Sequence, residues 1–148
     1  MAVVITGSAY GKRATLEVDG SDGDRLTWRA VRGFAAVHEN IVTTIHAVRE
    51  AGYFELRHTW AGFAIAALGT LWLVSEGAVV GLSTIAAGIG WIGWRFTHPR
   101  RFLALDLGQS QLVMKIDPGS AAAARALADR IDRAIASGEE PATPPMLP

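Results

Sequence analysis

The chain of 148 residues contains no cysteine. This absence excludes disulfide bonds, a thiol nucleophile and any metal site with cysteine ligands. An excess of charge of either sign is missing as well, because 14 Lys and Arg residues balance 14 Asp and Glu residues. Nucleic-acid binding draws much of its affinity from a basic excess. The composition therefore gives no case for a nucleic-acid partner, and we expect none.

Charge is also nearly absent from the middle of the chain. Between His58 and Arg95, Glu76 is the only Asp, Glu, Lys or Arg residue, and it separates two apolar runs, 59–75 and 77–94. At about 1.5 Å per residue, each run makes a helix of about 25 Å, which approaches the roughly 30 Å of a bilayer core. The sequence therefore predicts a two-helix transmembrane hairpin.

Glu76 marks the turn of this hairpin. One continuous helix through both runs would be far longer than a bilayer is thick, and its carboxylate would lie at great cost in hydrocarbon. Tryptophans stand near the ends of the runs, where indole rings favour the lipid headgroup level. These residues are Trp60, Trp72, Trp91 and Trp94. A hairpin buried in a soluble domain is the alternative, but it needs a larger shell than the rest of the chain provides.

Arginines beside the hairpin predict its orientation. Arg57 precedes the first run, Arg95, Arg100 and Arg101 follow the second, and the turn between the runs has no basic residue. Basic flanks stay on the cytoplasmic side. We therefore expect both termini in the cytoplasm and the protein in the inner (plasma) membrane. Residues 1–5 lack the basic start of a cleavable signal peptide, so none is expected.

Small residues recur at helical spacing in both runs. Such residues let two helices approach closely in lipid. The candidate packing positions are Gly62, Ala66, Gly77, Gly81 and Gly88. Two interpretations stay open: the small faces pack only within the hairpin, or one of them serves a homo-oligomer or a partner subunit in the membrane.

The segment before the hairpin, 1–58, is expected to be rich in strands. Apolar residues alternate with polar ones over 14–18 and 25–30, on either side of a turn at 19–24, which is typical of a β-hairpin. Residues 32–40 have no clear pattern. We favour a strand over 41–48, which is rich in β-branched residues, and a helix over 34–48 is the alternative. Residues 53–56 are expected either to form a further strand or to lead directly into the first apolar run.

The segment after the hairpin, 95–138, has a clearer pattern. Alternation over 103–107 and 111–116 around a turn predicts a second β-hairpin. A helix follows, with Ser120 as candidate N-cap and Gly138 as its stop. The tail, 139–148, holds four of the six prolines, and we predict it to be disordered.

Neither segment alone buries a sizeable core, so both are expected to form one cytoplasmic domain. The fold class predicted is an α+β membrane protein, in which an antiparallel β-sheet with a C-terminal helix is interrupted by the transmembrane hairpin 59–94. Residues 40–45, 102–107 and 117–135 resemble uncharacterised bacterial membrane proteins that have a split pleckstrin-homology-like (PH-like) domain. The resemblance covers roughly residues 25–137. It implies architecture and carries no catalytic residue.

Two motifs imitate cofactor sites. Residues 7–13, GSAYGKR, suggest a phosphate-binding loop, but they are one residue short and precede a strand rather than a helix. Residues 88–93, GIGWIG, fit the dinucleotide pattern but lie inside a predicted membrane helix. The histidines show no metal-ligand spacing. We therefore expect no cofactor and no metal.

These patterns favour a non-enzymatic scaffold or interaction module in the membrane, with the lipid bilayer as its first partner. An anionic-lipid sensor is the alternative, because basic side chains near a membrane surface attract acidic headgroups. Its candidate contacts are Arg57, Arg95, Arg100 and Arg101. A second alternative is an accessory subunit of a membrane enzyme or transporter.

Overall fold

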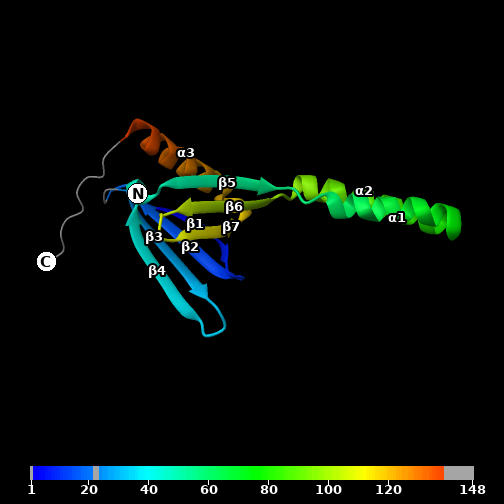
Figure 1. Cartoon of the computed structure of the whole chain (residues 1–148), viewed down its shortest axis with the longest axis horizontal. Coiled ribbons are helices and arrows are strands. Elements are labelled where there is room, and N and C mark those ends of the chain that lie inside the picture. The colour runs from blue at the N-terminus through cyan, green and yellow to red at the C-terminus, as the bar shows by residue number, and fades with distance from the viewer. Residues whose placement is uncertain (1, 22–23, 139–148) are drawn as a thin grey trace. The chain divides into compact units, whose positions relative to one another are not determined.

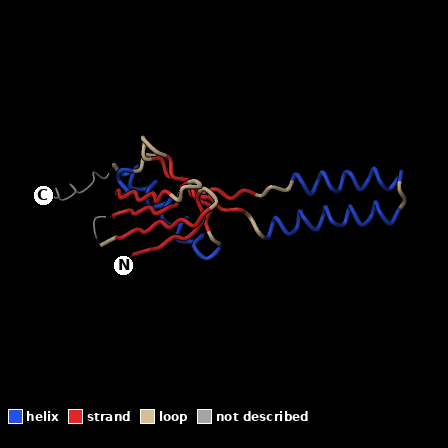
Figure 2. The backbone as a smooth tube through the Cα atoms, turned by 90° about the horizontal axis from the view of Figure 1, so that it is seen from below, coloured by secondary structure: helices blue, strands red, loops and turns tan. Residues whose placement is uncertain are grey.

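The computed structural model describes residues 2–21 and 24–138, and the predicted tail at 139–148 lies outside them. The chain divides into two compact units. One unit combines residues 1–54 with 101–148, and the other spans Glu55–Arg100. The fold is α+β: the first unit is an antiparallel sheet with a C-terminal helix, and the second is a helical hairpin (Figures 1 and 2).

Seven strands form one curled sheet in the order β4-β3-β2-β1-β7-β6-β5. The registered pairs are all antiparallel, and β1 pairs with β7 through Gly7 opposite Ile116. The strand order therefore joins the beginning of the chain to its last strand. The strands are β1 (Ala2–Ala9), β2 (Lys12–Asp19), β3 (Arg25–Arg32), β4 (Val37–Thr44), β5 (Glu50–Leu56), β6 (Arg100–Asp106) and β7 (Gln111–Ile116).

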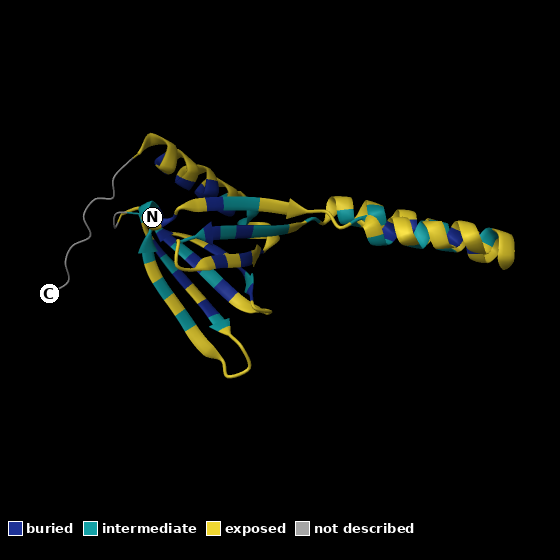
Figure 3. Ribbon diagram, viewed as in Figure 1, coloured by how far each residue is buried: buried dark blue, intermediate teal, exposed yellow. Residues whose placement is uncertain are grey.

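One face of the sheet is the core face. The alternation predicted over 14–18 and 25–30 places every second residue there, so that Leu16, Leu26 and Trp28 are almost completely buried. The two β-hairpins expected from alternation are present as β2–β3 and β6–β7. Figure 3 shows the resulting bands of buried and exposed residues along the strands. The apolar pattern therefore decides which face of each strand is covered.

Helix α3 (Ala121–Ser137) covers this core. Its buried stripe is Ala124, Leu127, Ala128, Ile131 and Ala134. The helix ends as predicted at Gly138, which adopts the left-handed conformation (φ 63°). An ion pair between Arg130 and Asp24 connects the exposed side of the helix to the turn before β3.

Ser120 stands at the N-cap position, but its side chain does not cap α3. A 3₁₀ turn, Pro118–Ser120, precedes the helix. The Ser120 hydroxyl instead accepts the Thr6 N–H and lies 3.1 Å from the Thr6 hydroxyl. The prediction of a side-chain cap was wrong because β1 offers this hydroxyl a competing backbone donor.

The strand favoured over 41–48 is confirmed for 41–44 only, and the alternative helix over 34–48 is absent. A turn at 33–36 leads into β4, which ends at Thr44, and Ile45–Ala47 is a short 3₁₀ helix. The Ile45 N–H donates to the Asp24 carbonyl (3.1 Å), and Ile45 and Val48 are both buried. The apolar residues after Thr44 thus turn into the core instead of extending the strand.

The second unit contains α1 (Trp60–Ser75) and α2 (Ala78–Thr97), joined through Glu76 and Gly77. The helices pack against each other, and α2 continues three residues beyond the predicted end at 94. Among the described residues, α2 is the one helix long and apolar enough to cross a membrane; α1 is apolar but shorter. The structure therefore contains the predicted helical hairpin. Whether the hairpin spans a bilayer is addressed under the proposed function.

Candidate functional site

Glycines make the contact between α1 and α2. A Cβ at Gly88 would lie 2.7 Å from the Gly62 carbonyl oxygen, and a Cβ at Gly69 would lie 2.9 Å from that of Gly81. Each pair brings backbone against backbone. Within each helix the two glycines are seven residues apart, which is two turns, so they lie on one face. This face leaves no room for a side chain at these four positions.

Ala66 lies on the same contact face, whereas Gly77 does not. A Cβ at Gly88 would approach the Ala66 nitrogen to 2.7 Å and its Cβ to 3.0 Å. Gly77 lies in the turn with φ 102°, and a Cβ there would meet nothing within 4 Å. The expectation that Gly77 packs between the helices was therefore wrong. Its role is to supply a backbone conformation that L-residues rarely adopt.

Large apolar side chains point away from the helix contact. Val74 is 91% exposed and Trp60 is 69% exposed within this unit. Figure 3 shows exposed residues along both helices. The others with large exposure are Phe63, Leu68, Leu71, Trp72, Val79, Val80, Leu82, Ile89, Trp91, Trp94 and Phe96.

Arg95 lies among aromatic rings at the end of α2. Its guanidinium carbon is 5.5 Å from the Trp91 ring centroid and 5.2 Å from that of Trp94. The two indoles are themselves 5.7 Å apart. The Arg95 Nε is buried and has no hydrogen-bond partner in the part of the chain that is described. Indole faces hold the guanidinium by cation–π attraction while leaving its remaining N–H groups able to donate.

Arg57 makes a similar contact at the start of the hairpin. Its guanidinium carbon lies 5.7 Å from the Phe96 ring centroid, and one of its nitrogens is 3.7 Å from the Glu55 carboxylate. Both partners of this ion pair are partly exposed, so it contributes little stability. Arg100 is exposed at the boundary of this unit, while Arg101 belongs to β6 in the sheet unit. Of the four predicted headgroup contacts, the structure thus places Arg57 and Arg95 against aromatic rings of the hairpin.

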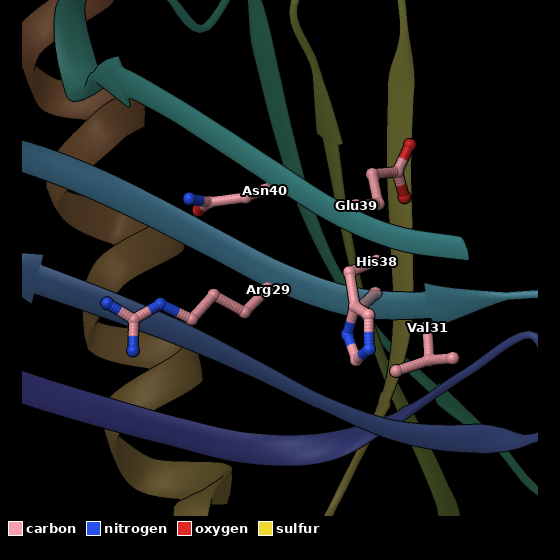
Figure 4. A pocket seen from close by; sticks show the side chains of 6 residues that line it. Arg29, Val31, His38, Glu39 and Asn40 are labelled. Atoms are coloured by element: carbon pink, nitrogen blue, oxygen red, sulfur yellow. The ribbon is translucent and has the colours of Figure 1, made fainter. Parts of the chain in front are cut away.

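A shallow depression of about 210 Å³ lies on β3 and β4. Figure 4 shows its lining residues, among them Arg29, His38 and Asn40. Arg29 is opposite Asn40 in the strand register. Glu39 also lines the depression, and its carboxylate accepts the Trp28 indole N–H (3.2 Å). Sequence reasoning missed this site because the strand that it favoured began only at residue 41, after Asn40. The pairing of β3 with β4, which places Arg29 opposite Asn40, was therefore not predicted.

The two cofactor-like motifs are placed in regular elements. Residues 7–13 run from β1 through the tight turn at Tyr10 and Gly11 into β2, so a strand follows them. A phosphate loop requires a helix N-terminus there. Residues 88–93 lie within α2. Within 2–21 and 24–138, no three His, Asp or Glu side chains gather closely enough to hold a metal ion.

Comparisons of the chain with known protein families, with curated proteins and with solved structures found no match.

Proposed function

We propose that this chain is an integral membrane protein whose helical hairpin spans the bilayer, and that it acts as a non-enzymatic scaffold or interaction module. The observation that carries the proposal is the outward apolar surface of α1 and α2. Summed over these side chains, contact with lipid in place of water is worth on the order of 20 kcal/mol. Glycine contacts between the helices agree with this, since close backbone approach favours helix association in lipid.

The short helix α1 fits a bilayer when its flanks are included. Its 16 residues span about 24 Å. Trp60 and Trp72 near its ends suit the headgroup level, where short spans are accommodated by local thinning. Both termini are proposed to be cytoplasmic at the inner (plasma) membrane, because the basic residues flank the hairpin and Glu76 occupies its turn.

The sheet unit is proposed to be PH-like. Its support is the seven-stranded antiparallel order, with β1 beside β7, and the single C-terminal helix across the core. The hairpin joins β5 to β6, which are neighbours in this order. Fold likeness alone does not assign an activity. The protein is therefore proposed to bind the bilayer, and to bind either further copies of itself or another membrane subunit.

Membrane extraction and cysteine labelling test the anchor and its orientation. Because the chain has no cysteine, Glu76→Cys introduces a single thiol. We expect the chain to resist alkaline carbonate, and the thiol to react with an impermeant maleimide from outside intact cells. Ser110→Cys in the β6–β7 turn is the matched control and should react only after lysis. Release by carbonate would refute the anchor, and the reverse labelling pattern would refute the orientation.

The scaffold role predicts recovery of a partner or of a homo-oligomer in mild detergent. Size-exclusion chromatography with light scattering measures the mass of the purified complex. A stable monomer without a partner would contradict the scaffold role. Stoichiometric recovery of an enzyme or transporter component would instead identify the chain as an accessory subunit.

Arg95 favours lipid sensing as a second candidate function. Its guanidinium lies within cation–π range of two indoles, and an anionic headgroup is the ligand that such a partly dehydrated cation prefers. The test is co-purification of anionic lipid by the wild type and by Arg57→Gln/Arg95→Gln, with Arg133→Gln on α3 as the matched control. Equal lipid recovery by all three would eliminate this candidate.

A further inference from the structure

The turn between β3 and β4 presents a phenylalanine to solvent. Phe34 is fully exposed at this turn, residues 33–36. The turn is well defined: the Ala36 N–H donates to the Gly33 carbonyl (3.4 Å), and both residues have positive φ. A single exposed apolar ring is common and needs no explanation by itself. Its surroundings decide whether it has a role.

Basic residues surround this turn. The Lys12 ammonium donates to the Gly33 carbonyl (3.0 Å), which connects the start of β2 to the turn. The Arg32 guanidinium lies 5.4 Å from the ring centroid of Tyr10, which is half exposed in the β1–β2 turn. Two aromatic rings and two cations thus come together at the ends of two neighbouring β-hairpins.

The strands behind the turn are also basic. Arg29 and His38 line the depression in Figure 4. Residues 1–16 and 25–38 contain no Asp or Glu. Glu39 is the nearest acidic residue along β4, and its carboxylate is engaged by the Trp28 indole. The surface around Phe34 is therefore complementary to an anion, not to a cation.

The end of the sheet that carries the β1–β2 and β3–β4 turns is also the end at which the chain continues into the helices. Gly7 on β1 is opposite both Ala14 on β2 and Ile116 on β7, and Ile116 is opposite Arg101 near the start of β6. The β1–β2 turn and the start of β6 therefore share one end of the sheet. The β6–β7 turn, with Ser110, lies at the other end.

We propose that this surface, named here the basic finger (Tyr10, Lys12, Arg32 and Phe34), binds the anionic headgroup surface of the bilayer, with Phe34 inserted among the headgroups. The proposal rests on the proposed function, which supplies the bilayer. Guanidinium and ammonium groups donate to lipid phosphates, and an aromatic ring is stable at headgroup depth. A single-stranded nucleic acid also offers phosphates, and its bases stack on aromatic rings, so the last test below separates it from the bilayer.

A fluorescent label beside Phe34 measures this contact in the full chain. Ala35→Cys is labelled with an environment-sensitive dye, and the chain is placed in nanodiscs of phosphatidylcholine with or without phosphatidylglycerol. We expect a blue-shifted emission and quenching by headgroup-level spin-labelled lipid in the anionic discs. The same dye at Ser110→Cys should show neither change. Identical spectra for the Ala35→Cys label with and without phosphatidylglycerol would overturn the proposal.

Charge and ring variants separate the two parts of the finger. Arg32→Glu should reduce the population in contact at least about fivefold, which corresponds to the loss of one cation near an anionic surface. Arg133→Glu makes the same charge change on α3 and should leave the population unchanged. Phe34→Ser should abolish quenching while the circular dichroism spectrum stays that of the wild type. Equal effects of the finger and control substitutions would refute a specific contact.

The test of the basic finger does not depend on whether the helical hairpin anchors the chain in a membrane. If the chain proves extractable by carbonate, the labelled protein is mixed with preformed vesicles of the same two compositions. Blue shift and co-sedimentation with anionic vesicles only would support the finger even though the anchor had failed. No shift with anionic vesicles would overturn the finger. A shift produced equally by single-stranded DNA without lipid would identify a general polyanion site and also overturn it.

Discussion

Gly88→Ala tests the helix contact most directly. The added methyl group would lie 2.7 Å from the Gly62 carbonyl oxygen and 2.7 Å from the Ala66 nitrogen, whereas ordinary contacts begin at 3.4 Å. Both neighbours are backbone atoms, which no rotamer change can move. The helices must therefore separate locally by about 0.7 Å.

The cost of this separation follows from packing. A gap of about 0.5–1 Å loses a quarter to a half of the attraction of each affected atom pair, and overpacking a well-filled contact costs about 1–3 kcal/mol. Gly90→Ala is the matched control on the same helix, because a Cβ there meets nothing within 4 Å. It removes a glycine from a helix interior and should be neutral or stabilising by up to about 1 kcal/mol.

Unfolding of the full chain in mixed micelles with increasing SDS measures both variants. Helical circular dichroism and tryptophan fluorescence report on the hairpin. We expect Gly88→Ala to unfold at a lower SDS fraction than the wild type, and Gly90→Ala at the same or a higher fraction. Adding Ala66→Gly should restore part of the loss, since it removes one of the three close neighbours of the new methyl group. Equal midpoints for Gly88→Ala and Gly90→Ala would refute the glycine contact.

Three further predictions concern single positions. Ile131→Ala on α3 deletes a fully buried side chain and should lower the free energy of unfolding of the sheet unit by about 2–5 kcal/mol in chemical denaturation. Gly77→Ala places an L-residue at φ 102° and should destabilise the hairpin by about 1–3 kcal/mol in the SDS titration, unlike Gly90→Ala. Hydrogen bonds from the side chain and backbone of Ser21 hold the pKa of Asp19 below its usual range. The Asp19 carboxylate therefore stabilises the fold at pH values above its unfolded-state pKa, and this stabilisation is lost as the pH falls through its folded-state pKa. Melting temperatures of the wild type should therefore fall more steeply in acid than those of Asp19→Asn, and parallel pH curves would contradict this.

Local patterns predicted the regular elements well. Alternation identified β2, β3, β6 and β7, because each strand buries one face on the same core. The stripe and the terminal glycine identified α3 for the same reason. These signals depend only on residues that are close together in the sequence, so no knowledge of distant contacts was needed.

The turn at 33–36 and the end of β4 could not be predicted because distant contacts decide them. The turn before β4 depends on positive φ at Gly33 and Ala36, and alanine gives no signal of that conformation. The end of β4 depends on a hydrogen bond between Ile45 and Asp24. The depression at Arg29 and the exposed Phe34 follow from the position of this turn, so the sequence did not reveal them either.

Because β1 pairs with β7, the sheet is completed only after most of the chain has been synthesised. A ribosome completes β1 to β5 before the helices and makes β6, β7 and α3 last. Leu56 and Ser137 are 81 residues apart. At about 5–20 residues per second, roughly 4–16 s pass before α3 is available. During that interval the core side chains of β2 and β3 have no helix to cover them, and exposed apolar strands of this kind are prone to aggregate.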